Sequence, residues 1–267
     1  MEDLHGRVAV VTGAAGGIGL ALVEQLAAEG MRVVMSDVDG ERLAAAAATV
    51  EGEVEPVAAD VARPQDVETL ATRAAERFGA VDVLCNNAGV TRPGPAWELA
   101  LEEWQWLLSV NVLGVVHGIR AFVPTMLARG EPGHVVNTAS IGGLLPYAGI
   151  AAYTASKYAV VGLSEGLRLD LQAAGSPIGV SVLCPGPTET DFRAHSRALH
   201  PAGPADDVEG EYDGVARISA TAAAALVVDA IRTDRFWVLT HPSYRPAIER
   251  RTRGIVETDE VVAGDFR

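Results

Sequence analysis

The sequence alternates short, continuously apolar runs with longer segments of helical periodicity, and this order is the strongest constraint on its fold. Apolar runs typical of strands covered on both faces occur at 7–12, 32–36, 54–59, 81–85, 134–138, 178–183 and 236–240. Segments with helical spacing lie between them, at 18–30, 41–50, 64–78, 99–128, 151–171 and 216–231. This order predicts an α/β protein in which a doubly wound parallel sheet lies between two layers of helices.

The size and charge of the chain limit its organisation and partners. A chain of 267 residues with 49% apolar residues can bury the core of one α/β domain, so we expect a single domain over 1–267. A net charge of −14 argues against nucleic acid as a partner. Cys85 and Cys184 lie inside apolar runs, which indicates buried thiols in a reducing compartment rather than a disulfide. We expect no metal site. With neither a signal peptide nor a membrane-spanning run, we expect a cytoplasmic protein with no membrane partner.

Glycines separate the first expected strand from the first expected helix. Gly13, Gly16, Gly17 and Gly19 follow the run at 7–12, and helical spacing begins at Ile18. Because glycine has no Cβ atom, backbone N–H groups can approach a pyrophosphate, whose charge the helix dipole also favours. We interpret this segment as a phosphate cradle; the alternative is a tight structural turn.

Asp37 stands at the end of the second expected strand, about 20 residues beyond the glycines. A carboxylate at this position accepts hydrogen bonds from the ribose hydroxyls of NAD and repels the 2′-phosphate of NADP. No Lys or Arg stands in the glycine turn or directly after Asp37, and Arg42 is the nearest cation. We therefore expect NAD as the cofactor. The alternative role of Asp37 is a helix cap, which Asp39 already fills well.

Other polar and small residues also fall at the expected carboxyl ends of strands, where doubly wound sheets bind their ligands. They are Asp60 and Val61, then Asn86, Asn87, Ala88 and Gly89, then Ser140, and finally the close-approach turn that contains Pro185 and Gly186.

The helix expected at 151–171 carries Tyr153 and Lys157 four residues apart, and hence on one face. A free tyrosine, with a pKa of about 10, transfers protons poorly at neutral pH, but a neighbouring ammonium favours the phenolate. Tyr153 is therefore a candidate acid/base for an alcohol. The alternative is an amphipathic helix in which the pair is incidental.

Two further features concern the site. Asn111 lies in the middle of the apolar helix 99–128, either as a core cross-link or as a kink and water site, and Pro124 should loosen the last turns of that helix. The segment 187–215 is polar, contains three prolines and has little periodicity. We expect a mobile loop that acts as an active-site lid rather than a linker.

The chain resembles the short-chain dehydrogenase/reductase family over about 6–237. The motifs that carry the resemblance are Thr12-Gly13-x-x-x-Gly17-x-Gly19, Asn86-Asn87-Ala88-Gly89, Asn111, Ser140, Tyr153-x-x-x-Lys157 and Pro185-Gly186. The glycine spacing also fits the longer sugar-nucleotide epimerase branch, whereas chain length and the Asn-Asn-Ala-Gly motif favour the short oxidoreductase branch. The resemblance implies a Rossmann fold.

The resemblance also implies roles for single residues. Tyr153 would be the acid/base, Ser140 would hold the substrate oxygen, Lys157 would bind the nicotinamide ribose, and Asn111 would anchor a proton-relay water. Cofactor contacts are expected at Gly13, Gly17, Ile18, Gly19, Asp37, Asp60, Val61, Asn87, Ala88, Gly89, Tyr153, Lys157, Pro185, Gly186 and Thr188. Thr190 is the alternative to Thr188 near the carboxamide, because an extra proline and Glu189 alter the usual pattern there.

These observations favour an NAD-dependent dehydrogenase that interconverts a secondary alcohol and a ketone. An NADP-dependent ketone or acyl-thioester reductase is disfavoured by Asp37. A non-catalytic dinucleotide sensor is disfavoured because all four catalytic positions are filled.

An apolar small-molecule substrate is suggested by Ile141, Leu144, Tyr147, Ile150 and Phe192. The family implies a homotetramer, for which helix faces bearing Trp104 and Trp106, or Gly162, Ser164 and Gly166, are candidates.

Overall fold

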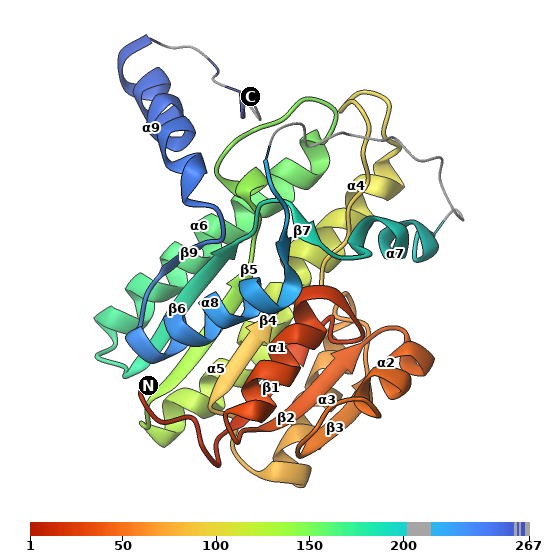
Figure 1. The fold of residues 1–267 in the computed structure, drawn as a ribbon, viewed down its shortest axis with the longest axis vertical. Coiled ribbons are helices and arrows are strands. Elements are labelled where there is room, and N and C mark those ends of the chain that lie inside the picture. The colour runs from red at the N-terminus through yellow and green to blue at the C-terminus, as the bar shows by residue number, and fades with distance from the viewer. Residues whose placement is uncertain (202–214, 259–260, 262, 265–267) are drawn as a thin grey trace.

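A single seven-stranded parallel sheet forms the centre of the computed structural model, which describes residues 1–201, 215–258, 261, 263 and 264 (Figure 1). The strand order is β3-β2-β1-β4-β5-β6-β9, and every neighbouring pair is parallel. The strands are β1 Val8–Thr12, β2 Arg32–Asp37, β3 Val54–Ala58, β4 Val83–Asn86, β5 Gly133–Thr138, β6 Ile178–Cys184 and β9 Trp237–Leu239. The predicted doubly wound single domain is confirmed.

Helices cover both faces of this sheet. One layer contains α1 Gly17–Ala28, α2 Gly40–Ala47 and α8 Ala220–Thr233, and the other contains α3 Pro64–Phe78, α5 Gly114–Arg129 and α6 Ala151–Ala173. Alternate strand residues face the two layers: Ala9 and Val11 pack with α1 and α8, whereas Val8 and Val10 pack with α3 and α5. Burial on both sides explains why the strands are continuously apolar in sequence.

The segment 99–128 is not one regular helix. It consists of α4 Leu101–Leu108, a π-helical turn at Ser109–Leu113 and α5, which continues past Pro124 to Arg129. The π turn contains Asn111, so the expected irregularity of this helix lies at Asn111.

The described part of the segment that was expected to be an irregular loop contains regular structure. The segment from 187 contains β7 Thr188–Glu189, paired with β8 Ile218–Ser219, and α7 Phe192–Ala198. The rest of the expected lid, 202–214, lies outside the described residues. The tail contains a 3₁₀ turn Pro242–Tyr244, helix α9 Arg245–Arg253 and a π turn Gly254–Thr258. Buried Tyr244 and Ala247 pack against Ile141 and Leu145, which anchors the start of α9.

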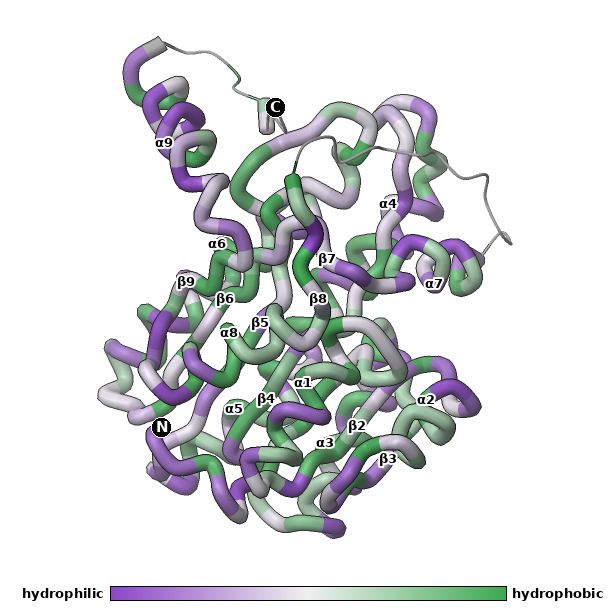
Figure 2. Tube along the Cα trace, in the orientation of Figure 1, coloured by the Kyte–Doolittle hydropathy of each residue, from purple (hydrophilic) through white to green (hydrophobic). Residues whose placement is uncertain are grey.

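Beyond this anchor, α9 extends away from the sheet (Figure 1) and is mainly hydrophilic (Figure 2). The strands in the centre of the molecule are mainly apolar in the same view.

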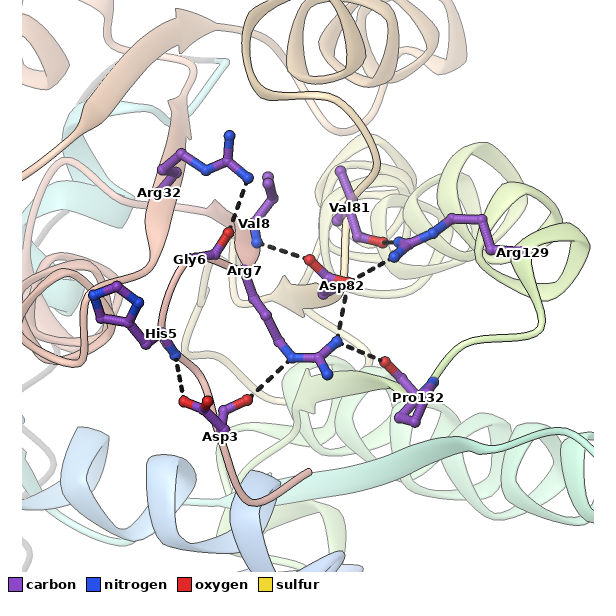
Figure 3. Close-up of polar contacts among 10 residues, drawn as sticks. All are labelled: Asp3, His5, Gly6, Arg7, Val8, Arg32, Val81, Asp82, Arg129 and Pro132. Atoms are coloured by element: carbon purple, nitrogen blue, oxygen red, sulfur yellow. Dashed lines mark hydrogen bonds and ion pairs between the residues drawn. The ribbon is translucent and has the colours of Figure 1, made fainter.

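A buried carboxylate joins the amino ends of the central strands (Figure 3). Asp82 accepts hydrogen bonds from the Val8 amide at 2.9 Å, from Arg129 at 3.0 Å and from Arg7 at 3.3 Å. Its own main chain links β1 to β5, because its amide donates to Val8 and its carbonyl accepts from His134. The cluster lies at the opposite sheet edge from the strand carboxyl ends and therefore stabilises the fold away from the site.

One described helical run, Leu101–Arg129, is long and apolar enough to cross a membrane by length and composition alone. Its buried residues Phe122, Val123 and Met126 pack against the sheet. The apolar character of this run therefore has an explanation within the fold.

Candidate active site

A cavity of about 830 Å³ opens at the carboxyl ends of the strands. Its wall includes Gly13, Gly17, Ile18, Gly19, Asp37, Asp60, Val61, Asn87, Ala88, Gly89, Ser140, Tyr153, Lys157, Pro185, Gly186 and Thr188. The fold thus brings every predicted catalytic and cofactor-binding residue except Asn111 to this cavity, and Asn111 lies behind its wall. Of the residues expected to form the apolar pocket, Ile141, Ile150 and Phe192 line the cavity, whereas Leu144 and Tyr147 do not, because they pack in the apolar cluster around Leu145 and Tyr244.

The glycine turn is packed so closely by neighbouring backbone that it has no space for side chains. Gly13 has φ +65°, and a β-carbon there would lie 2.7 Å from Ala88 Cα. A β-carbon on Gly19 would collide with the Gly13 carbonyl oxygen, so the first turn of α1 packs directly on the residue that follows β1. The N-cap of α1, Gly16, makes no side-chain hydrogen bond. The first N–H groups of α1 therefore lack a side-chain cap, as a bound pyrophosphate requires.

Asp37 is buried at the end of β2, and its carboxylate already shapes the neighbouring loop. Oδ2 accepts from the Ala15 amide at 3.1 Å and Oδ1 accepts from the Asp39 amide at 3.1 Å. Each oxygen keeps a lone pair that a ribose hydroxyl can use. The alternative role as helix cap belongs to Asp39, whose Oδ1 accepts from the Arg42 amide at 3.0 Å.

At the end of β3, the carboxylate of Asp60 accepts from the Ala62 amide at 2.9 Å, and the Val61 carbonyl contacts His117 Nδ1 at 2.8 Å. These bonds fix the Asp60-Val61 turn against α5. The two residues lie in the cavity wall on the same side as Asp37.

Thr12 was not predicted as a site residue, yet it organises the turn after β4. Its hydroxyl accepts from the amides of Asn87, at 3.0 Å, and Ala88, at 3.1 Å. Asn87 in turn donates to the carbonyls of Thr12 and Gly13 at 3.1 and 3.3 Å. These bonds hold the turns after β1 and β4 together. The sequence contained a signal for this role of Thr12, because Thr12 directly precedes Gly13 of the glycine turn.

Ser140 and Tyr153 face the same part of the cavity. Ser140 lies two residues beyond the end of β5, and its hydroxyl accepts from the Gly142 amide at 3.0 Å. A β-carbon on Gly142 would lie 3.5 Å from Ser140 Oγ and 3.6 Å from Tyr153 Cε1, so one glycine separates the two side chains. The Tyr153 ring lies 6.3 Å from the Phe192 ring, which belongs to α7.

Lys157 is 3% exposed, and its Nζ lies 5.7 Å from the centre of the Tyr153 ring. Nζ donates to the Thr138 carbonyl at 3.0 Å. Burial lowers the pKa of Lys157 from 10.5 to about 8, an effect that the nearby Cys184 partly opposes. The ammonium is therefore held without a full counter-charge, ready for an oxygen ligand in the cavity.

Asn111 is fully buried and cross-links three parts of the site. Its side chain accepts from the Val90 amide at 2.8 Å and donates to the Val90 carbonyl and to Ser156 Oγ, both at 2.9 Å. Ser156 donates to the Tyr153 carbonyl at 2.7 Å. A β-carbon on Gly89 would lie 3.3 Å from both Asn111 Oδ1 and Lys157 Nζ. The predicted core cross-link is present, and Asn111 also lies in the π turn.

The turn after β6 is held by residues that the sequence analysis did not identify. Gly186 donates to Thr240 Oγ1 at 2.9 Å, and a β-carbon there would lie 2.6 Å from His241 Nδ1. Thr188 Oγ1 donates to the Gly186 carbonyl at 3.0 Å, whereas Thr190 lies against the glycine turn, 3.2 Å from the position of a β-carbon on Gly17. Both threonines line the cavity, Thr190 toward its phosphate end.

Residues 187–201, which we call the strap, cross the cavity mouth and contact three separate parts of the chain. Ser196 Oγ accepts from the Thr91 amide at 3.1 Å, and His200 Nε2 lies 3.2 Å from Glu103 Oε1. Asp191 forms an ion pair with Arg42 of α2. Sequence reasoning missed these contacts because each joins residues that are far apart in the chain and share no motif.

Comparisons with known proteins agree with this geometry. The family model for short chain dehydrogenase matches residues 7–200. A 1-deoxy-11-beta-hydroxypentalenate dehydrogenase of Streptomyces exfoliatus is 43% identical over 91% of this chain and 86% of its own. The 3beta-hydroxysteroid dehydrogenase 2 of Eggerthella lenta is 36% identical over 80% of this chain and 83% of its own.

A similar solved structure is a short-chain dehydrogenase/reductase from Burkholderia phymatum in complex with NAD. It has a TM-score of 0.89 and 38% identity, and the match covers 99% of each chain. The fold, the motifs and these relatives lead to one conclusion: the chain belongs to the short-chain dehydrogenase/reductase family and is an oxidoreductase that acts on CH–OH groups.

Proposed function

We propose that this protein is an NAD-dependent dehydrogenase that interconverts a secondary alcohol and a ketone on an apolar carbon skeleton. The observation that carries the proposal is the convergence of Ser140, Tyr153 and Lys157 on the cavity that also contains the glycine turn and Asp37. When bound, the nicotinamide cofactor supplies the hydride acceptor or donor. The residues of the chain must then bind the alcohol, orient it and move its proton.

Tyr153 is the proposed acid/base, and Ser140 is the proposed donor that holds the substrate oxygen. Ser140 Oγ and Tyr153 Cε1 lie 3.5 and 3.6 Å from the position that a β-carbon on Gly142 would take, which supports the proposal that both side chains reach one oxygen atom. In the oxidation direction, the phenolate of Tyr153 takes the hydroxyl proton as the C–H bond is broken. In the reduction direction, the phenol returns that proton to the forming alkoxide.

Lys157 has two proposed roles, which its position supports. Its ammonium lies close enough to the Tyr153 ring to favour the phenolate, and its remaining N–H groups can donate to the hydroxyls of the nicotinamide ribose. Asn111 is the proposed anchor of a relay water. Both hydrogens of its amide are engaged with Val90 and Ser156, so the water must bind to an oxygen atom of Asn111.

The preference for NAD rests on Asp37, which disfavours the alternative of an NADP-dependent ketone or acyl-thioester reductase. A 2′-phosphate would be placed against a buried carboxylate there. The other alternative is a non-catalytic dinucleotide sensor. It is disfavoured because binding a dinucleotide does not require Ser140 and Tyr153 to lie together in the cavity.

The apolar character of the substrate is a proposal from the cavity wall. Trp106, Val110, Ile141, Ile150 and Phe192 line the cavity, and the Phe192 ring lies 6.3 Å from the Tyr153 ring. The relatives named as hydroxypentalenate and hydroxysteroid dehydrogenases indicate hydroxyl groups on polycyclic skeletons. A cavity of about 830 Å³ can hold such a skeleton together with the nicotinamide end of a cofactor.

The test is a panel of cyclic secondary alcohols and their ketones with NAD and NADP, followed by the near-ultraviolet absorbance of the reduced nicotinamide. We expect reduction of NAD with at least one apolar alcohol. Binding of NAD in calorimetry without turnover of any panel member, ketones included, would favour the sensor.

The strap is the described part of the proposed lid, 187–215. Its Phe192 and Thr190 lie over the Tyr153 ring and the glycine turn, so its movement would open both ends of the cavity. His200 is buried, and Leu199 packs beside Leu107 and Trp104. The lid must therefore move about a fixed end near His200, and truncations that probe it should begin after Pro201.

We also propose a cytoplasmic homotetramer. Four leucines of the helical run Leu101–Arg129 are exposed, Leu101 and Leu108 in α4, Leu113 in the π turn and Leu127 in α5, and Gly162 and Gly166 of α6 face open space. These surfaces suit close helix packing between subunits. Two expected interface residues do not fit it, because Ser164 is buried and bonded to Asn137 and Trp106 lines the cavity. Light scattering at micromolar concentration tests the proposal, and a monomeric mass would contradict it.

A further inference from the structure

Arg42 lies beside the carboxylate that is proposed to bind the adenosine ribose. Its Nε donates to the Ala15 carbonyl at 3.2 Å, while the Ala15 amide donates to Asp37 Oδ2 at 3.1 Å. A β-carbon on Gly16 would collide with the Arg42 guanidinium. The guanidinium and Asp37 therefore flank one residue of the glycine turn, and the cation lies where a ribose 2′-phosphate would find a partner.

In this structure the guanidinium is engaged with the strap instead. Arg42 forms an ion pair with Asp191 Oδ2, and its Nη1 lies 2.8 Å from His195 Nδ1. These contacts join α2 to the strap across the phosphate end of the cavity.

Solvent exposure indicates what this pair does. The side chain of Arg42 is 31% exposed and that of Asp191 is 51% exposed. Ion pairs that are exposed to this degree contribute little to folding stability. The pair still determines which anion the guanidinium can meet, because a bonded carboxylate neutralises the cation and occupies one edge of its planar fork.

We propose that Asp191 is a specificity-determining residue that disfavours NADP by engaging Arg42. This inference rests on the proposed function, because it assigns the choice between the two nicotinamide cofactors at the same site. Asp37 opposes the 2′-phosphate directly. Asp191 opposes it by withholding the cation, so the strap takes part in cofactor selection as well as in covering the substrate.

The test is equilibrium binding of NAD and NADP by titration calorimetry, which needs no turnover. Four proteins form a double-mutant cycle: the wild type, Asp191→Asn, Arg42→Met and the double variant. Glu189→Gln is the matched control, because it removes one carboxylate from the same strap, two residues before Asp191, and Glu189 has no role in the proposed site.

We expect Asp191→Asn to tighten NADP binding by up to about fivefold, because an ion pair this exposed withholds the cation only weakly, and to change NAD binding less than about twofold. The double variant should lose this gain, and Glu189→Gln should not show it. Asp191→Ser is a second variant that gives the same expectation if the amide interferes with the strap.

Three results would overturn the inference alone: unchanged NADP binding in both Asp191 variants, a gain that persists in the double variant, or an equal gain in Glu189→Gln. A wild type that prefers NADP would overturn it together with the proposed role of Asp37. Failure of the wild type to bind either cofactor would contradict the proposed function itself.

Discussion

Lys157 should make the protein without cofactor less stable near neutral pH than at alkaline pH. The side chain is 3% exposed, donates to the Thr138 carbonyl and has a pKa lowered from 10.5 to about 8 by burial. Replacing Lys157 with Met keeps the length of the side chain and removes the charge. The difference in unfolding free energy between the two proteins then reports the energy of holding this ammonium in the fold.

The magnitude follows from the two pKa values. Each pKa unit corresponds to about 1.4 kcal/mol, so a fall from 10.5 to about 8 corresponds to about 3 kcal/mol. Because the folded pKa is the lower one, the unfolded chain binds more protons between pH 8 and pH 10.5. Wild-type stability relative to Lys157→Met should therefore rise through this window, with the full penalty present below pH 8 and none remaining above 10.5.

The assay is urea unfolding of both proteins without cofactor at intervals from neutral pH to about pH 10.5, the ordinary Lys value. Other groups that titrate at alkaline pH occur in both proteins, so their contribution largely cancels in the difference. The lost bond to the Thr138 carbonyl should lower the stability of Lys157→Met by about 1–3 kcal/mol at every pH, a constant offset that leaves the slope unchanged. A difference that stays flat across the window would refute the reasoning.

Three further predictions test separate parts of the structure. Tyr153→Phe should abolish turnover and leave NAD binding in calorimetry almost unchanged, and retained turnover would contradict the acid/base assignment. Asp82→Asn should lower the unfolding free energy measured in urea by about 1–3 kcal/mol, because it weakens a buried acceptor for Val8, Arg7 and Arg129. The kcat of this variant should be unchanged, because Asp82 lies at the opposite end of the strands from the cavity. Asp37→Ala should weaken NAD binding at least about tenfold and narrow its advantage over NADP, and equal affinities in the wild type would count against it.

The strands and most helices could be predicted from local patterns in the sequence. Burial on both faces makes the strands continuously apolar, and burial on one face makes the helices periodically apolar. The prediction of a helix at 64–78 coincides with α3, and the run at 178–183 falls one residue short of β6. Pro64 at a helix start and periodic apolar residues are local signals that tertiary packing reinforces here.

The same local signals could not separate α4, the π turn and α5. An apolar residue at nearly every third or fourth position continues through Ser109–Leu113, so the extra residue of the π turn leaves no gap in the pattern. What fixes the π turn is the side chain of Asn111, which bonds both main-chain groups of Val90, 21 residues away.

The strap shows why contacts across the cavity need the structure. Arg42 has acidic neighbours in sequence, and local pairing with Asp39 or Glu41 is the simplest expectation. Asp39 accepts from the Arg42 amide as the N-cap of α2. The guanidinium of Arg42 instead turns back over the glycine turn, where its Nε donates to the Ala15 carbonyl, and it meets Asp191, 149 residues away. A contact between residues so far apart in the chain depends on how β2, α2 and the strap are brought together by the sheet, and this arrangement leaves no local pattern in the sequence.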